Sequence, residues 1–420
     1  MGTRVSRNRR AAIAVLGAGL TGVATALELA RRDVHVTLVD QDPRAVNRAS
    51  LRNEGKIHLG LIYANDRTLA SARLQLEGAL SFRSLLSRWI GPRADTLPLS
   101  TPYVYLVARD SLLTVDQLEQ HYAAVESLYR EHVRHDPGID YLGSRPTRLY
   151  ERCPPGGVPQ PFNMDHFIGG FLTQELAIDT DALARALRDA VGESEGIDFL
   201  SEHKVLSVER ANGLLRIEGT NPNGTWRIDT DQVVNALWEN RIAFDRMIGV
   251  NCPTGWVHRL KYRVIAQIPG KLRGGPSATM VLGPYGDVVV RADGTAYLSW
   301  YPIGLQGWTH EISPPAAWNS PCRGEIEEAK SRSLARDILG AIDARYPGMG
   351  ESRPILVDAG AIVAYGKTDV DDASSALHDR TQIGVTSIEG YHSVDPGKLT
   401  TAPLFAKRAA DHVCEFEAQR

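Results

Sequence analysis

Cysteine is scarce in this sequence, and the four cysteines form no C-x-x-C pair because they lie far apart, at Cys153, Cys252, Cys322 and Cys414. We therefore expect no metal site and no redox dithiol, and reduced thiols favour a cytoplasmic location. No run approaches the roughly 18 apolar residues that a membrane span needs. The arginines of residues 1–10 resemble the start of a signal peptide, but glycines and Glu28 interrupt the apolar run that follows. We expect a frayed N-terminal tail and no export.

The sequence also lacks an excess of charge of one sign. Its net charge is −3, with 43% hydrophobic and 23% charged residues. This balance is typical of a globular protein and gives no reason to expect nucleic acid or an anionic membrane as a partner. Internal repeats and low-complexity segments are absent as well. Because 420 residues exceed one ordinary domain, we expect two domains, intertwined or sequential.

The most informative stretch runs from Ile13 to Asp40 and reads IAVLGAGLTGVATALELARRDVHVTLVD. It predicts a buried strand, a G-x-G-x-x-G turn at Gly17, Gly19 and Gly22, a helix, and a second strand that ends in Asp40. The glycines allow the tight turn, the approach of a pyrophosphate and close packing of the helix, whose N-terminus offers N–H groups to phosphates. Asp40 can accept hydrogen bonds from an adenosine ribose and disfavours NADP. The motif indicates a dinucleotide site but does not separate FAD from NAD.

The remaining chain alternates helical and strand patterns. The polar loop of residues 41–66 follows the motif directly, which favours a cofactor-facing segment over a solvated connector. Thr114 and Gln117 have the spacing of a capping box. Helices are predicted over residues 67–89, 114–133, 180–190 and 325–346, with a last helix near the C-terminus. Strands are predicted over residues 103–107, 197–200, 203–209, 231–237, 260–268, 278–282, 286–290 and 296–300.

Four separated blocks of this sequence resemble the D-amino-acid oxidase and sarcosine oxidase superfamily of FAD flavoproteins. The blocks are GAGLTG with Asp40, GGFLTQELAIDTDAL, VVNALW and SVDPGKLTTAP, and they occur in that family's order. The resemblance implies an α/β fold, in which a doubly wound, Rossmann-like FAD-binding domain is interleaved with a substrate domain built on an antiparallel β-sheet. It places the FAD-binding domain in residues 1–90, 165–250 and 355–420, and the substrate domain in residues 91–164 and 251–354.

The resemblance also assigns residues to the cofactor. It assigns the ADP half of FAD to the three motif glycines and Asp40, and the passage of the pyrophosphate to Ser50. An adenine contact is assigned to the backbone of Val205, and Ala236 is placed where the return strand crosses near the cofactor. The segment with Lys56, Ile57 and His58 is expected beneath the flavin. The flavin's pyrimidine end is assigned to Gly397, Lys398, Leu399 and Thr400, where helix N–H groups can stabilise negative charge.

Two residues are predicted to be catalytic. Lys398 stands at a helix start, where the helix dipole disfavours a cation unless an anion compensates. In sarcosine-oxidase-like members the matching lysine helps to hold the substrate carboxylate, and His58 falls where such enzymes place a substrate-facing cation. The alternatives are a solvated surface lysine and a structural histidine.

The sequence departs from the family at two points. Amino-acid oxidases of this family often carry a carboxylate-clamping arginine, but DAGAIVAYG, residues 358–366, has none. Arg380 is either a substitute clamp or part of a structural salt bridge. No cysteine lies where monomeric sarcosine oxidases attach flavin, and the tryptophan-histidine pair of histidyl-linked relatives is absent near Ser50, so we expect non-covalent FAD. Further candidates for the pocket, the core or an exposed strand face are Trp300, Tyr301, Tyr365, Lys261 and Arg263.

Three functions follow from these residues. The leading one is an FAD-dependent oxidoreductase that oxidises a C–N bond of an amine or amino-acid-like small molecule by hydride transfer to flavin N5, with oxygen or another electron acceptor. The second is an FAD-dependent hydroxy-acid or alcohol dehydrogenase or oxidase, for which His58 or His392 would act as a base. The third is a structural or assembly subunit that binds FAD without turnover. A flavin monooxygenase is disfavoured because the C-terminal block lacks a GDA-type segment.

Overall fold

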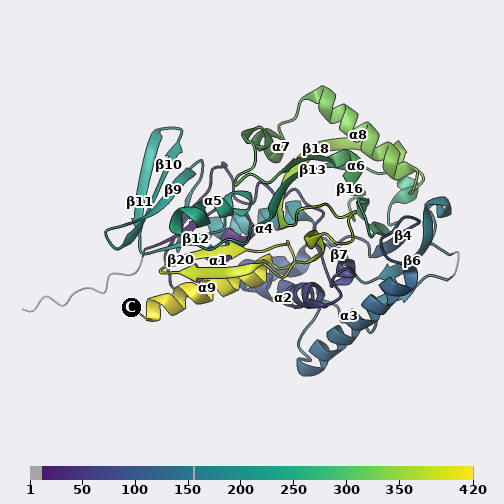
Figure 1. Ribbon diagram of the computed structural model, residues 1–420, viewed down its shortest axis with the longest axis horizontal. Helices are drawn as coiled ribbons and strands as arrows, with labels where there is room; N and C mark the ends of the chain where they lie inside the picture. Colours follow the sequence, from purple (N-terminus) through teal and green to yellow (C-terminus); the bar gives the residue numbers. More distant parts are fainter. Residues whose placement is uncertain (1–11, 155–156, 420) are drawn as a thin grey trace, which may run out of the picture.

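Two large β-sheets organise the computed structural model, which describes residues 12–154 and 157–419 (Figure 1). The predicted frayed tail of residues 1–10 lies outside the described residues. The first sheet has six strands in the order β19-β20-β12-β1-β2-β8. All of its pairings are parallel except that of the edge strand β19. The bounds are β1 Ile13–Leu16, β2 Val36–Val39, β8 Ile197–Leu200, β12 Gln232–Asn235, β19 Gly384–Ile388 and β20 Tyr391–Asp395.

Strand β1 is buried on both faces, which explains its uninterrupted apolar sequence. Ile13 and Val15 pack into the core beneath four helices, whereas Ala14 and Leu16 pack beneath a three-stranded sheet and α5. The four helices are α1 Leu20–Ala30, α2 Ala70–Ile90, α4 Thr180–Gly192 and α9 Ala402–Ala418. The opposite layer consists of β9 Lys204–Ala211, β10 Leu214–Asn221, β11 Gly224–Thr230 and α5 Arg241–Ile248.

The second large sheet has nine strands in the order β17-β13-β16-β15-β14-β4-β6-β5, with β18 paired to β13. Its pairings are antiparallel apart from the parallel pair β14 and β4. Helix α8 Glu328–Asp343 packs on one face, and α3 Val115–His135 begins with the predicted capping box at Thr114. The strand bounds are β4 Tyr103–Ala108, β5 Tyr150–Arg152, β6 Phe167–Thr173, β13 Trp256–Gln267, β14 Ser277–Val281, β15 Gly286–Val290, β16 Thr295–Trp300, β17 Leu305–Thr309 and β18 Arg353–Tyr365.

These sheets confirm the predicted α/β class, with a doubly wound sheet and a mostly antiparallel second sheet. The predicted boundaries depart from the sheets at two strands. Residues 165–250 and 355–420 were assigned to the FAD-binding domain, yet β6 pairs with β4 and β18 pairs with β13 in the nine-stranded sheet. Strand partners far apart in the sequence fix this membership, and the local pattern does not reveal them.

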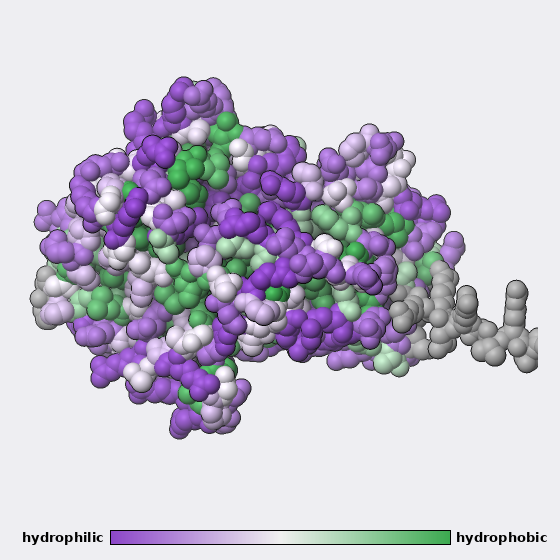
Figure 2. Space-filling model, turned by 180° about the vertical axis from the view of Figure 1, so that it is seen from behind, coloured by the Kyte–Doolittle hydropathy of each residue, from purple (hydrophilic) through white to green (hydrophobic). Residues whose placement is uncertain are grey.

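The surface mixes polar and apolar residues. Hydrophobic side chains are interspersed among hydrophilic ones on the face shown in Figure 2. Within the described residues, no helix combines the length and the apolarity needed to cross a bilayer.

Candidate active site

A cavity of about 340 Å³ lies between the two large sheets. Its lining comes from the first turn of α1, the polar loop after β2, the segment after β12, one face of the nine-stranded sheet, the segment between β18 and β19, and the segment that precedes α9. The volume is in the range of small-molecule sites. Residues from distant parts of the chain therefore surround one space.

The turn after β1 forms one end of the cavity. Gly17 has a φ of +93°, and a Cβ at this position would lie 2.6 Å from the carbonyl oxygen of Ala236, so the turn requires glycine. The N–H groups of Ala18 and Asp42 donate to the Asp40 carboxylate at 2.6 Å and 2.8 Å. Burial raises the pKa of Asp40 to about 6, although these N–H groups oppose the shift. Asp40 thus lines the cavity and also holds the turn in place.

The start of α1 is built to receive an anion. The helix has no acidic residue in its first turn, and no side chain caps it at Gly19. The N–H of Leu20 donates to Ser50 Oγ at 2.9 Å, so Ser50 is fixed beside this turn. N–H groups and the positive end of the helix dipole favour phosphate at such a site.

The arginines of the polar loop are compensated within the protein. Arg48 forms ion pairs with Asp42 at 3.0 Å and with Glu239 at 3.7 Å. Arg52 forms an ion pair with Asp358 at 3.1 Å. Burial raises the pKa of Glu239, with Arg48 opposing the shift. The charges of Arg48 and Arg52 are therefore paired within the protein.

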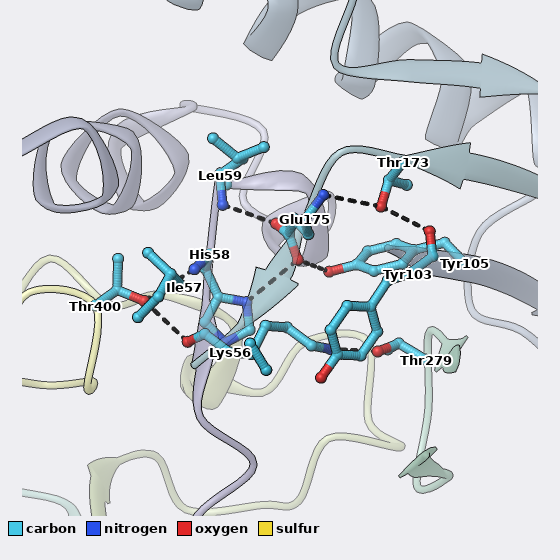
Figure 3. A network of polar contacts seen from close by, with 12 residues as sticks. Lys56, Ile57, His58, Leu59, Tyr103, Tyr105, Thr173, Glu175, Thr279 and Thr400 are labelled. Atoms are coloured by element: carbon cyan, nitrogen blue, oxygen red, sulfur yellow. Dashed lines mark hydrogen bonds and ion pairs between the residues drawn. The ribbon is translucent and has the colours of Figure 1, made fainter. Parts of the chain in front are cut away.

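His58 lies in a buried polar network beyond the short strand β3 Lys56–Ile57 (Figure 3). Its backbone N–H donates to Thr400 Oγ1 at 2.9 Å, which ties this segment to the chain before α9. Its Nδ1 lies 3.7 Å from Glu175 Oε2, and its Nε2 lies 3.9 Å from Glu54 Oε1, both longer than hydrogen bonds. Burial lowers the pKa of His58, with Glu175 opposing the shift, so the imidazole is neutral at neutral pH. This differs from the predicted cation.

Glu175 is the buried acid of this network. It accepts hydrogen bonds from the N–H of Leu59 at 2.8 Å and from the hydroxyl of Tyr105 (Figure 3). Burial raises its pKa, but His58 and the charge of Lys56 outweigh burial, so the net pKa is lowered. The network therefore places the Glu175 carboxylate beside the ring of His58.

The side chain of Lys56 points to the nine-stranded sheet. Its Nζ donates to Asp287 Oδ1 at 3.0 Å and to Thr279 Oγ1, and it lies 4.1 Å from the centre of the Tyr103 ring. The side chain thus links β3 to β15 of the nine-stranded sheet through Asp287. Only the backbone of Lys56 remains for the predicted cofactor contact.

Strand β13 presents cations along one face. Leu260, Tyr262 and Val264 pack in the core with α8, so the alternating residues between them point the other way. Arg259 and Lys261 line the cavity. Arg263 is next on this face, and its Nε and Nη2 donate to Oδ1 and Oδ2 of Asp358 at 2.6 Å and 3.1 Å. The predicted shared face of Lys261 and Arg263 is therefore present, and it is buried rather than solvated.

Two further cations, Lys398 and Arg380, line the cavity away from β13 in the sequence. Lys398 is half-buried, and burial lowers its pKa, with Glu54 opposing the shift. Arg380 lies on the segment between β18 and β19 and also lines the cavity. Among the described residues its guanidinium has no hydrogen-bond or ion-pair partner, which argues against the structural salt bridge.

Ten of the predicted residues line the cavity: Gly17, Gly19, Asp40, Ser50, Lys56, His58, Ala236, Gly397, Lys398 and Leu399. Gly22, Ile57, Val205 and Thr400 lie outside the lining. A Cβ on Gly22 would lie 1.8 Å from the Gly17 carbonyl oxygen, so this glycine allows helix and turn to pack closely. Val205 lies on β9, where its side chain packs in the core of the three-stranded sheet. The roles assigned to these residues stay predictions.

Of the other residues predicted as pocket candidates or bases, some line the cavity and some do not. Tyr301 lines the cavity, whereas Trp300 and Tyr365 do not. His392, the second candidate base, is buried between Gln232 and Ser387, away from the lining.

The sequence analysis missed several lining residues. These are Glu54, Tyr63, Arg259 and Asp287, together with Glu175 behind His58. The charge at every second position of β13 was the available signal for Arg259. The acids carry no local signature, because their partners lie on other elements.

Comparisons with known proteins agree with this architecture. A family model described as FAD dependent oxidoreductase (DAO) matches residues 12–411. No curated protein matches the chain.

Solved structures share the fold over nearly the whole chain. Glycine oxidase from Geobacillus kaustophilus has a TM-score of 0.66 at 14% identity, covering 96% of this chain and 95% of its own. Iminodiacetate oxidase from Chelativorans sp. BNC1 has a TM-score of 0.63 at 17% identity, with coverage of 96% and 95%. The dithionite-reduced L-alpha-glycerophosphate oxidase from Mycoplasma pneumoniae, solved with FAD bound, has a TM-score of 0.62 at 14% identity, with coverage of 96% and 94%.

The residues of the cavity fit such a dinucleotide. The Gly17 turn leaves no room for a side chain, and the start of α1, which has no acidic residue in its first turn, lies beside Ser50. At the flavin end, several buried polar atoms have no hydrogen-bond partner among the described residues, including the hydroxyl of Tyr63 and Nδ1 and Nε2 of His58. Polar groups of this kind are expected where a bound group completes the hydrogen bonds.

Proposed function

Because the chain belongs to the FAD dependent oxidoreductase family, we propose that it oxidises a C–N bond of an amine or amino-acid-like small molecule that carries a carboxylate. Family membership makes the chain an FAD-dependent oxidoreductase, so the interpretation as a subunit without turnover is set aside. The bound FAD supplies the acceptor for the two electrons and one hydrogen that leave the carbon as hydride. The resulting imine hydrolyses in water, and the electrons pass to oxygen or another acceptor.

The observation that carries this proposal is the meeting of cations from separate elements at one cavity. Lys398 comes from the segment before α9, Lys261 from β13, and Arg380 from the segment between β18 and β19. A carboxylate bound here gains charge-assisted hydrogen bonds in a buried site. We assign Lys398 to the substrate carboxylate, because it lines the cavity and its ammonium forms no ion pair among the described residues.

The protein's own groups position the reactants and exclude water. The Gly17 turn, the start of α1, Asp40 and Ser50 hold the ADP half, and Gly397 to Leu399 approach the flavin. The nine-stranded sheet closes the opposite side. Holding the carbon against the acceptor in a dry site is the main contribution that this chemistry needs from a protein.

His58 is assigned a proton-accepting role. Hydride leaves only from an uncharged amine, so the substrate ammonium must first lose a proton. His58 lines the cavity as a neutral imidazole, because burial lowers its pKa. Its Nε2, which faces Glu54 at 3.9 Å, is the atom that would take this proton.

The same neutral imidazole favours one second candidate function. Oxidation of a hydroxy acid requires a base for the hydroxyl proton, and His58 can supply it. The two functions differ in the substrate that donates electrons, so one experiment separates them.

That experiment is anaerobic reduction of the purified, FAD-loaded chain. Loss of the flavin absorbance is followed after addition of carboxylated amines, amines without a carboxylate, or hydroxy acids. We expect bleaching by carboxylated amines, and a Lys398→Gln variant should lose about tenfold or more in bleaching rate at low substrate concentration. Lys367→Gln is the control, because Lys367 is exposed. Bleaching by hydroxy acids alone would establish the second function, and no bleaching by either class would contradict both.

A further inference from the structure

We infer that the substrate carries two anionic groups, and that the second one binds between Arg259 and Arg380. This inference rests on the proposed function, which places one carboxylate at Lys398. The substrate class is then an amine with two carboxylates, or with one carboxylate and one phosphate.

Arg259 is a buried cation with unused hydrogen-bonding capacity. It is 2% exposed, lies on β13 and lines the cavity. Its Nη1 donates to Asp369 Oδ1 at 3.2 Å, but its Nε has no hydrogen-bond partner among the described residues. A buried guanidinium normally makes a bidentate contact with an acid. A ligand carboxylate would complete the contacts that Asp369 leaves open.

Arg380 stands close to Arg259 without an acid of its own. Its backbone N–H donates to Ser71 Oγ at 2.9 Å, which fixes its position on the segment between β18 and β19. Its guanidinium has no hydrogen-bond or ion-pair partner within residues 12–154 and 157–419. Burial and then the charge of Arg259 lower the pKa of Arg380. Two neighbouring guanidinium groups in a cavity repel one another unless an anion lies between them.

Tyr63 adds a neutral donor to this pair. It is 6% exposed and lines the cavity, and its hydroxyl has no hydrogen-bond partner among the described residues. Arg380 is close enough to oppose the rise in the pKa of Tyr63 that burial causes. Two guanidinium groups and a hydroxyl thus form an anion site that the protein does not fill.

The cations of the substrate end are compensated unequally. Five cationic side chains line it: Lys56, Arg259, Lys261, Arg380 and Lys398. Lys56 and Lys261 share Asp287 at 3.0 Å and 3.8 Å, and Asp369 lies 3.2 Å from Nη1 of Arg259. Arg380 has no acid within ion-pair distance among the described residues, and an uncompensated charge is costly in a buried site. The Arg259 and Arg380 pair is therefore where a second anion is stabilised.

The two anion sites share one cavity. Tyr301 lines it, with Nζ of Lys261 4.3 Å from the centre of its ring, and Arg259 lies two residues before Lys261 on the same face of β13. A substrate with two anionic groups can engage both sites, whereas a monocarboxylic amino acid would leave the arginines without an anion.

The test uses binding as well as turnover. The FAD-loaded full chain is titrated with malonate, succinate and glutarate, and with acetate, propionate and butyrate, while the flavin spectrum is followed. We expect at least one dicarboxylate to bind about tenfold or more tightly than the monocarboxylates. In Arg380→Gln this advantage should disappear, with dicarboxylate binding weakened by about tenfold. Arg353→Gln is the control, since Arg353 is exposed on β18.

A second arm compares substrates in matched pairs. Aspartate and asparagine, glutamate and glutamine, and iminodiacetate and N-methylglycine differ in one anionic group, and phosphoserine against serine tests a phosphate. A higher kcat/KM for the dianionic member, lost in Arg380→Gln and reduced in Tyr63→Phe, supports the inference. Equal kcat/KM values, or an equal loss for both members, would overturn it.

Failure of the proposed function gives a different pattern. If only hydroxy acids bleach the flavin, the proposed C–N oxidation is wrong, and the titrations still test whether Arg259 and Arg380 bind a second anion. If dicarboxylates and monocarboxylates bind equally in the titrations, this second anion site is wrong whichever substrate is oxidised.

Discussion

The guanidinium of Arg241 lies 2.7 Å from Oδ2 of Asp395, and both side chains are buried. Oδ1 of Asp395 accepts the N–H of Gly397 at 3.0 Å. Arg241 stands at the start of α5, on the far side of the six-stranded sheet from α9, and Gly397 lies in the cavity lining. This pair therefore anchors the segment predicted to approach the flavin.

Asp395→Asn should destabilise the protein and weaken FAD binding. Removing one partner of a buried ion pair costs about 3 kcal/mol or more. We expect the low end, because Arg241 keeps its second acid, Asp245, at 2.7 Å. Urea unfolding with saturating FAD measures the free energy, and fluorescence of released FAD measures its affinity. Glu389→Gln, an exposed change, is the control; an unchanged FAD affinity in Asp395→Asn would contradict the anchoring role.

Gly22→Ala should weaken FAD binding although Gly22 does not line the cavity. The new Cβ would lie 1.8 Å from the carbonyl oxygen of Gly17, so helix α1 must move away from the turn. Overpacking of this kind costs about 1–3 kcal/mol, and we expect FAD to bind about tenfold more weakly. Gly340→Ala on α8 is the control, because its Cβ would meet open space. Equal FAD affinity in the two variants would refute the packing argument.

Asp40 should make the stability of the FAD-free protein fall as the pH rises from about 4 to 6. Burial raises its pKa from 3.8 to about 6, so the folded state holds a proton that the unfolded chain has already released. The folded state therefore gains stability at low pH and loses it as the pH passes through this range. The change amounts to about 2–3 kcal/mol.

Asp40→Asn removes this titration. Chemical unfolding of the FAD-free proteins at several pH values measures the difference between wild type and variant. The gap between the two curves should change mainly between pH values of about 4 and 6. A gap that is constant over this range would show that Asp40 has an ordinary pKa.

Asp369→Asn should strengthen the binding of dicarboxylates. The Asp369 carboxylate lies 3.2 Å from Nη1 of Arg259, so a ligand carboxylate competes with it for the same guanidinium. Removing the competing charge should tighten succinate or malonate binding severalfold. Asp371→Asn, an exposed change on the same segment, is the control. Weaker binding in Asp369→Asn would mean that Asp369 orients Arg259 for the ligand.

FAD should be released when the protein is denatured. None of the four cysteines lies in the cavity lining. Precipitation with acid followed by an absorbance spectrum of the supernatant measures the released flavin. Yellow colour that stays with the pellet would show a covalent bond and would contradict the expectation.

Much of the predicted cofactor end of the cavity could be inferred from local sequence. The turn at Gly17, the helix that starts at Leu20 and the strand that ends in Asp40 lie within one short stretch, so spacing alone predicted them. The capping box of Thr114 and Gln117 was predictable for the same reason, because both partners lie within one turn. In contrast, the sheet partners of β6 and β18 are distant in the sequence, so the local pattern could not predict these pairings.

The sequence by itself determined the glycine turn between β1 and α1 and the strand before Asp40, and its separated blocks indicated a flavoprotein fold. Only the tertiary structure decided which charges remain available at the cavity. Arg48, Arg52 and Arg263 are compensated by nearby acids, whereas Arg380 has no ion-pair partner in the part of the chain that the structure describes. The physical reason is that a charged side chain's state depends on its neighbours in space, and the fold brings those neighbours from distant positions in the chain.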